Sequence, residues 1–289
     1  MTNLAVAVLG TGTMGAGMVR SLRRAGMPVR VWNRDASKAW ALSDSGAEVF
    51  DSPAEAARGA DVVLTMLMDA ESAVEVIRRA SPAAGTTWMQ CSTVGLDGAD
   101  ATIATARELG LVLVDCPVQG TRVAAESGNL VMLASGPEES RERLAPVFDA
   151  VGSRTLWLGE AGTGSRLKLA TNAWVLMLTA GVAQSIALTR SLGIDPRDFF
   201  AVIEGGPLDS AYARAKGGNM IDEDHPVSFA LPGALKDAQL IRAAAQSSGV
   251  ADRLIAAVVE TLRVATEQVA HPDAVDMSAV IAGLTSEHR

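Results

Sequence analysis

The chain has 289 residues, enough for one large domain or for two of ordinary size. It is 48% hydrophobic and 20% charged, a composition typical of globular proteins that excludes a disordered chain. The net charge of −8, the lack of a stripe of basic residues and an aromatic content of 4% argue against a nucleic-acid-binding protein.

Short apolar runs alternate with helix-forming segments through the first half of the chain. Segments of helical length, such as 14–25 and 99–109, lie between most of these runs. Strands that alternate with helices build βαβ units, so the sequence predicts an α/β domain of the Rossmann type with a mainly parallel sheet. A ligand is expected at the carboxyl ends of its strands. The predicted strands are 4–10, 28–33, 60–67, 86–92, 111–118, 130–135 and 154–159.

The strand pattern stops after residue 159, and apolar residues then recur at helical spacing. We therefore expect two domains, an α/β domain at 1–161 and an all-helical domain at 162–289, joined by a long interdomain helix. Gly193 is expected to follow the end of that helix. Asp195 is expected to cap the next helix, with Pro196 in its first turn.

The segment 169–189 has no charged residue and is long enough to span a bilayer. It nevertheless carries six polar side chains that would be costly in hydrocarbon, so we predict a helix buried in the protein or in a dimer, and no membrane span. These side chains are Thr171, Asn172, Thr179, Gln184, Ser185 and Thr189.

Cys91 and Cys116 are the only cysteines, and they favour a reduced thiol pair. The apolar run near the N-terminus follows no basic segment and reads as a first strand, not a signal peptide. We therefore expect a cytoplasmic protein.

The glycine pattern G-x-G-x-x-G spans residues 10–15, directly after the first predicted strand and at the start of a helix. Gly10 would permit the tight turn, Gly12 the close approach of a pyrophosphate, and Gly15 the packing of helix on strand. Thr13 and Met14 open the helix, whose N-terminus would face the phosphates. The pattern predicts a dinucleotide site, although a flavin or S-adenosylmethionine shares parts of it.

The end of the second predicted strand distinguishes between dinucleotides. NAD sites usually place an acidic residue here on the ribose 2′-hydroxyl, whereas this chain has Asn33 and Arg34. The Arg34 guanidinium would pair with a 2′-phosphate, so we predict NADP in preference to NAD. Asp35 would reverse this preference if its carboxylate faced the ribose.

Lys168 and Asn172 stand four residues apart at the start of the long helix, and therefore on one face of it. A structural alternative is that Lys168 bonds a neighbouring carbonyl and Asn172 is a satisfied buried amide. Only four of the 25 basic residues are lysines, and a desolvated amine exchanges a proton near neutral pH, which a guanidinium does not. We therefore predict Lys168 as a general acid/base.

Four motifs occur in order along essentially the whole chain: GTGTMGAGMVRSL (10–22), DCPVQGTRVAAESGNL (115–130), GTGSRLKLATN (162–172) and FALPGALKDAQL (229–240). With them the chain resembles the β-hydroxyacid dehydrogenase family, which includes 3-hydroxyisobutyrate dehydrogenase, tartronate semialdehyde reductase and glyoxylate/succinic semialdehyde reductases. The resemblance implies hydride transfer between a nicotinamide and a small β-hydroxy acid or semialdehyde. It also implies a 6-phosphogluconate dehydrogenase-like NAD-binding domain and a homodimer or homotetramer.

The resemblance implies a role for each matched position. Lys168 matches the catalytic lysine, Asn172 an asparagine that holds the substrate, and Lys236 a lysine near cofactor and substrate, followed by the usual acid Asp237. The remaining matches lie along the cofactor or line the closed cleft: Met66, Leu67, Met68, Thr93 and Phe229.

Two positions depart from the family pattern. The usual serine of its P-V-S-G motif, which helps bind the substrate carboxylate, is Gln119 here. Gln119 can still donate, and the backbone near Gly120 with the Thr121 hydroxyl would help carry the anion. Arg122 is expected at the surface. The frequent asparagine pair after the lysine retains only its second member, Asn172.

Two other functions stay open at this point. An NADPH-dependent imine reductase of the related family usually has another residue in place of the lysine. A non-catalytic dinucleotide-binding module that recruits partners would have no need of Lys168, Asn172 and Lys236. No metal site is expected, because the three histidines have no ligand spacing to one another or to cysteine.

Overall fold

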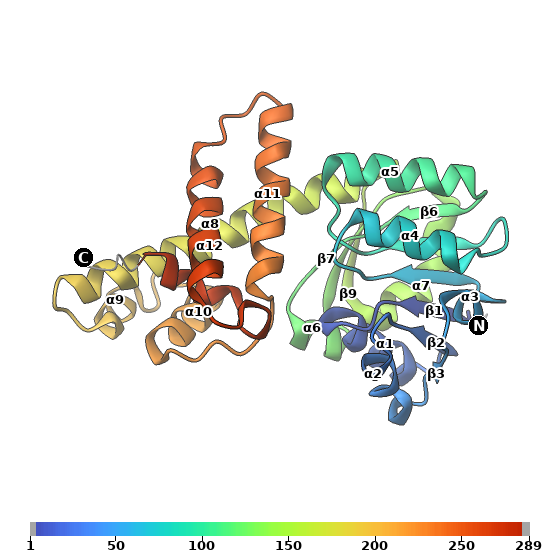
Figure 1. Cartoon of the computed structure of the whole chain (residues 1–289), viewed down its shortest axis with the longest axis horizontal. Coiled ribbons are helices and arrows are strands. Elements are labelled where there is room, and N and C mark those ends of the chain that lie inside the picture. The colour runs from blue at the N-terminus through green and yellow to red at the C-terminus, as the bar shows by residue number, and fades with distance from the viewer. Residues whose placement is uncertain (1–3, 285–289) are drawn as a thin grey trace. The chain divides into compact units, whose positions relative to one another are not determined.

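A computed structural model describes residues 4–284 of the chain. The chain forms two compact units, the first ending at Lys168 and the second beginning at Leu169 (Figure 1). The division falls within the long helix α8 (Thr163–Ser191).

The main sheet of the N-terminal unit has six strands in the order β3-β2-β1-β4-β5-β6, and all neighbours are parallel. The predicted parallel α/β architecture is confirmed. The two-residue strand β3 was not predicted, because so short a run has no detectable alternation. The strands are β1 (Val6–Leu9), β2 (Val29–Trp32), β3 (Glu48–Val49), β4 (Val62–Thr65), β5 (Thr87–Gln90) and β6 (Val112–Asp115).

Two apolar clusters cover the two faces of this sheet, since successive side chains of a strand point to opposite faces. On β1, Val6 and Val8 join the cluster with α1 and α7, whereas Ala7 and Leu9 join the one with α3, α4 and α5 (Figure 1). Burial on both faces explains why β1 is entirely apolar. The helices are α1 (Thr13–Arg24), α2 (Ala36–Trp40), α3 (Pro53–Ala57), α4 (Ala70–Ala80), α5 (Gly95–Glu108), α6 (Arg122–Ser127) and α7 (Glu139–Val151).

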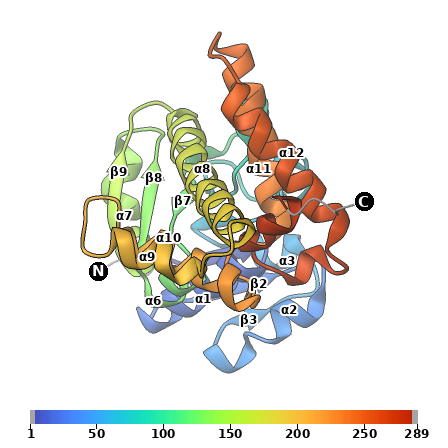
Figure 2. The ribbon, with the colours of Figure 1, turned by 90° about the vertical axis from the view of Figure 1, so that its left-hand side faces the viewer.

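A second sheet has three strands, β7 (Val118–Gln119), β8 (Leu130–Ala134) and β9 (Gly152–Trp157), visible side by side in Figure 2. β7 is antiparallel to β8, and β8 is parallel to β9. The prediction of a single strand at 111–118 was therefore wrong at its C-terminal end. Pro117 lacks an N–H, so it interrupts the ladder after β6 and the chain enters the other sheet at Val118.

The C-terminal unit is helical, as predicted, apart from one isolated bridge between Ala230 and Asp276. Helix α11 packs on α12, and both views show them side by side (Figure 2). After α8, Gly193 adopts a left-handed φ of 75°, and Asp195 accepts a hydrogen bond from the N–H of Arg197, so both helix-end predictions are confirmed. The helices are α9 (Pro196–Ile203), α10 (Ala211–Asp222), α11 (Leu231–Ser247) and α12 (Arg253–Gln268), followed by short turns at Pro272–Ala274 and Met277–Leu284.

Helix α8 is long and apolar enough to cross a membrane, with a mean hydropathy of 1.3 in its most apolar stretch. Within one chain, 39% of that stretch is buried. Trp174 on this helix is 66% exposed, and Leu192, directly after it, is 65% exposed.

Both cysteines are buried free thiols. Burial, together with the adjacent Cys91 thiol, raises the pKa of Cys116 well above its ordinary value. A buried thiol with a raised pKa is a poor nucleophile, which applies to Cys116, and both cysteines pack in the apolar cluster on one face of the sheet.

Candidate active site

The glycine loop between β1 and α1 has the shape that a dinucleotide requires. Gly10 has a φ of 105°, and a Cβ there would collide with the Met66 carbonyl oxygen. A Cβ on Gly15 would collide with the carbonyl oxygen of Gly10. Gly12, in contrast, has no neighbour within 4 Å of its Cβ position, and no side chain caps the helix that begins after it. The first N–H groups of α1 therefore face open space beside a cradle that only glycines allow, which fits a pyrophosphate.

Asn33 ties the end of β2 to this loop. Its Oδ1 accepts a hydrogen bond from the Thr11 N–H at 2.9 Å, and its Nδ2 donates to the Asp35 carbonyl at 2.9 Å. Both bonds engage the backbone. Asn33 therefore shapes the loop on which the cofactor would rest.

Asp35 faces its own helix. Its Oδ1 accepts hydrogen bonds from the N–H and the hydroxyl of Ser37, at 3.1 and 2.6 Å, and so caps α2. The hydroxyl bond from Ser37 lowers the pKa of this carboxyl. The acidic residue that would have favoured a ribose 2′-hydroxyl is thus engaged in capping.

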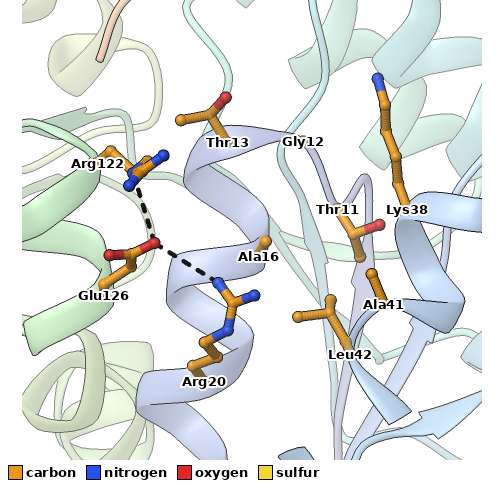
Figure 3. A pocket seen from close by; sticks show the side chains of 10 residues that line it. All are labelled: Thr11, Gly12, Thr13, Ala16, Arg20, Lys38, Ala41, Leu42, Arg122 and Glu126. Atoms are coloured by element: carbon orange, nitrogen blue, oxygen red, sulfur yellow. Dashed lines mark ion pairs between the residues drawn. The ribbon is translucent and has the colours of Figure 1, made fainter. Parts of the chain in front are cut away.

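A pocket of about 660 Å³ opens beside the loop (Figure 3). Lys38 from α2 and Arg122 from α6 reach into it on either side of α1, and Arg122 and Arg20 both pair with Glu126 at 3.6 Å. The sequence interpretation did not assign Lys38 or Arg20 to the site, and it placed Arg122 only at the surface. The lining residues are Thr11, Gly12, Thr13, Ala16, Arg20, Lys38, Ala41, Leu42, Arg122 and Glu126.

The predicted cofactor residues that follow β4 and β5 also lie at the carboxyl end of the sheet. Met66 follows β4, and its N–H donates to the Leu9 carbonyl at the end of β1. The Leu67 N–H donates to the Ser92 hydroxyl at 2.8 Å, which ties this segment to the turn before Thr93. Met68 continues the segment and is exposed.

Lys168 and Gln119 meet in the N-terminal unit. The Lys168 side chain comes from the second turn of α8, is 8% exposed, and donates from Nζ to Oε1 of Gln119 at 3.1 Å. Gln119 lies on β7, which places the residue that replaces the family serine against the predicted catalytic amine. Gly120 follows with a φ of 143°, and Thr121 begins α6 without capping it through its side chain.

Three predicted residues of the C-terminal unit form a second cluster. Asn172 donates from Nδ2 to Oδ2 of the buried Asp237 at 2.7 Å. The Lys236 ammonium lies 2.8 Å from the other oxygen of Asp237. Asp237, predicted as a substrate residue, therefore holds Asn172 and Lys236 in this structure.

Phe229, also predicted, lies just before α11. Its N–H donates to Oδ2 of the buried Asp276, which also pairs with Lys216 at 2.5 Å. A Cβ on Gly233 would lie 3.1 Å from the Phe229 ring, so the ring rests on the first turn of α11.

Among residues 4–284, no group of three His, Cys, Asp or Glu side chains is placed to hold a metal ion. The predicted site residues described above instead offer the buried amine of Lys168, the amide acceptor of Gln119 and a glycine cradle for phosphates.

Two family models match the chain. The model described as the NAD binding domain of 6-phosphogluconate dehydrogenase matches residues 5–159. The one described as NAD-binding of NADP-dependent 3-hydroxyisobutyrate dehydrogenase matches residues 162–284. Together they cover both units of the structure.

The chain is also similar to named dehydrogenases and reductases. Glyoxylate/succinic semialdehyde reductase 2 of Arabidopsis thaliana is 32% identical over 97% of this chain and 79% of its own. An NAD-dependent L-serine dehydrogenase of Pseudomonas aeruginosa is 32% identical over 74% of this chain and 70% of its own. The solved 3-hydroxyisobutyrate dehydrogenase of Salmonella typhimurium superposes with a TM-score of 0.87 at 26% identity, over 96% of this chain and 99% of its own.

The chain belongs to the β-hydroxyacid dehydrogenase family, and it is an NAD(P)-dependent oxidoreductase of that type. An imine reductase of Myxococcus stipitatus also superposes, with a TM-score of 0.64 over 98% of this chain and 99% of its own. Its identity of 19% is a likeness of fold alone.

Proposed function

We propose that the protein interconverts a small hydroxy acid and the corresponding oxo acid or semialdehyde, with NADP as cofactor and Lys168 as the general acid/base. The observation that carries the proposal is the buried Lys168 side chain, whose Nζ donates to Gln119 within the motif expected to bind substrate. The names of the relatives, a glyoxylate/succinic semialdehyde reductase and a 3-hydroxyisobutyrate dehydrogenase, support this substrate class.

When bound, the nicotinamide supplies the hydride for reduction and accepts it in the reverse direction. Lys168 moves the proton: its ammonium donates to the substrate oxygen as the carbonyl becomes a hydroxyl, and the neutral amine takes the proton back in oxidation. Gln119 accepts one N–H of that ammonium, which limits its rotation and aims its other protons.

Asn172 follows Lys168 by one turn on the same helix face, and we propose that it orients the substrate oxygen. Its amide is held by Asp237, so its direction is set before substrate arrives. We keep Lys236, Phe229 and Thr93 as proposed neighbours of substrate and cofactor, on the resemblance stated above.

The preference for NADP is supported by charge. Lys38, Arg20 and Arg122 line one pocket beside Thr11 and Gly12, and such cations favour a 2′-phosphate over a neutral hydroxyl. The capping role of Asp35 removes the main argument for NAD. Arg34 is exposed at the end of β2, one turn before Lys38.

We also propose that a second copy of this chain covers α8, giving a homodimer or a higher homo-oligomer. Leu188, near the end of α8, and Leu192, just after it, lie four residues apart and are both more than half exposed, as is Trp174 earlier on α8. Large apolar side chains exposed along one segment are typical of a protein interface.

Turnover of purified protein tests the proposed function. NADPH oxidation would be followed with glyoxylate, succinic semialdehyde and a cyclic imine, and NADP reduction with 3-hydroxyisobutyrate and L-serine. Reduction of an oxo acid or semialdehyde, or oxidation of a hydroxy acid, that is lost in Lys168→Ala supports the proposal. Turnover confined to the imine, or equal turnover in Lys168→Ala, contradicts it.

A further inference from the structure

A buried carboxylate and two serines fix the beginning of α8. Asp115 ends β6 and is 1% exposed, Ser135 directly follows β8, and Ser165 lies in the first turn of α8. All three are buried within the N-terminal unit. None of them takes part in the chemistry proposed above.

The oxygens of Asp115 and Ser135 accept hydrogen bonds from the first turn of α8. Oδ1 of Asp115 accepts from the Ser165 hydroxyl at 2.7 Å, and Oδ2 accepts from the Ser165 N–H at 2.8 Å and the Ser135 hydroxyl at 3.1 Å. The Ser135 hydroxyl oxygen in turn accepts from the N–H of Gly164 at 3.0 Å. Two N–H groups that a helix start leaves unpaired are thus satisfied by the ends of two strands.

The helix start is also pressed against the strands. A Cβ on Gly164 would collide with the Leu133 carbonyl oxygen and lie 3.0 Å from that of Asp115. Contact this close leaves the first turn of α8 little freedom to shift while the hydrogen bonds persist. A negative carboxylate at the N-terminus of a helix is favourable in addition.

Lys168 lies three residues after Ser165, one turn along the same helix face. Gln119 lies four residues after Asp115, at the start of the second sheet. In the sequence, Lys168 thus follows by three residues a serine that bonds the Asp115 carboxylate, and Gln119 follows Asp115 itself by four.

We propose that Asp115 is a positioning residue for Lys168, acting through Ser165. Its carboxylate sets the position of the first turn of α8, and so the place of the Lys168 amine against Gln119. The proposal rests on the proposed role of Lys168 in proton transfer. Asn in place of Asp115 would keep the shape but turn one acceptor into an NH₂ group facing donors, which displaces the helix start.

The test compares Asp115→Asn and Ser165→Ala with wild type, using whichever substrate the turnover assay proposed above identifies. A misplacement near 1 Å costs on the order of 10²-fold, so we expect kcat to fall about 10- to 100-fold in Asp115→Asn and less in Ser165→Ala. The KM and the fluorescence-measured Kd for NADPH should stay near wild type, because the glycine loop is untouched. Thr102→Val, which removes a buried hydroxyl bond within α5, is the control for loss of stability alone.

A second comparison separates positioning from general damage. In the Lys168→Ala background, Asp115→Asn should leave the residual turnover unchanged, because there is no amine left to position. A further drop in that background, parallel loss of NADPH affinity, or a wild-type kcat in both single variants overturns the proposal. If Asp115→Asn does not fold, Ser165→Ala decides.

The outcomes also distinguish this inference from the proposed function. Full turnover in Lys168→Ala would remove the proposed function itself. Loss of turnover in Lys168→Ala with wild-type kcat in Asp115→Asn and Ser165→Ala would remove only the positioning role.

Discussion

The amine of Lys168 donates a hydrogen bond to Oε1 of Gln119 at 3.1 Å. Gln119 stands where the family pattern has a serine, so in this chain an amide oxygen takes the place of a short hydroxyl beside the lysine proposed as general acid/base. An amide oxygen only accepts, whereas a hydroxyl also donates, so Gln119 Oε1 offers the Lys168 amine an acceptor and fixes the direction of one of its N–H groups.

Removal of this acceptor should slow the reaction. A hydrogen bond to a charged group contributes about 1.5–3 kcal/mol, so Gln119→Leu should lower kcat by about 10- to 100-fold. Gln119→Glu keeps an oxygen at the same reach and should retain more turnover than the leucine variant. Steady-state kinetics of the two variants check this, and a wild-type kcat in Gln119→Leu would show that the bond has no part in turnover.

The cations of the pocket beside the glycine loop should set the cofactor preference. Lys38→Ala and Arg122→Ala should each raise the KM for NADPH by about tenfold and leave the KM for NADH nearly unchanged, because only NADPH carries the 2′-phosphate. Arg141→Ala, an exposed arginine of α7, is the matched control. Equal effects on the two cofactors would assign these residues to the shared pyrophosphate instead.

The ion pair of Asp276 and Lys216 should make stability depend on pH in a defined direction. Burial alone would raise the pKa of Asp276, but Lys216 and the N–H groups of Phe229 and Ser278 outweigh it and hold that pKa below its ordinary value. A depressed folded-state pKa stabilises the protein above the unfolded value and loses this contribution as the pH falls through the folded value.

Asp276→Asn should therefore lower the free energy of unfolding by about 3 kcal/mol at pH 7, as expected for breaking a buried pair. The gap from wild type should persist down to pH 5 and narrow only below about pH 4. The nearby His225, whose pKa burial lowers, carries little charge near pH 7. Urea unfolding followed by circular dichroism measures the difference in the free energy of unfolding between wild type and variant. A difference that grew on acidification would contradict the predicted direction of the pH dependence.

The exposed leucines at and just after the end of α8, Leu188 and Leu192, should form the interface between copies. Leu188→Glu and Leu192→Glu each place a charge in an apolar contact and should shift the protein toward monomer. The kcat should stay close to wild type, because neither leucine is assigned to the proposed active site. Light scattering after size-exclusion chromatography gives the mass. A wild-type monomer, or an unchanged oligomer in both variants, would contradict the assignment.

Features encoded within a few residues could be predicted from the sequence. The glycine loop and the start of α9, with Asp195 as its cap and Pro196 in its first turn, depend on residues that are neighbours in the sequence. Both occur as expected. Strand β1 was recognisable because burial on both faces demands an unbroken apolar run. The strand β7 was not, since it has two residues and follows Pro117, which interrupts the strand before it.

Contacts between distant residues needed the structure. Gln119 and Lys168 are 49 residues apart, and no local sequence pattern predicts that Gln119 accepts a hydrogen bond from Lys168. The same holds for Arg122, which faces the pocket beside α1 although its surroundings in the sequence suggest only a surface helix. Asp115 was known only as part of a motif, and its bonds to Ser135 and Ser165 follow from the meeting of two sheets with α8.

The most direct test of the proposed role of Lys168 is the turnover of Lys168→Ala, measured together with the affinity of this variant for NADPH. General acid/base catalysis contributes about 10²- to 10⁴-fold, so kcat should fall by that factor while the Kd for NADPH stays close to wild type. Lys168→Arg, which keeps the charge but does not release a proton, should be nearly as slow. A kcat within a few-fold of wild type in either variant would contradict the central role of this amine.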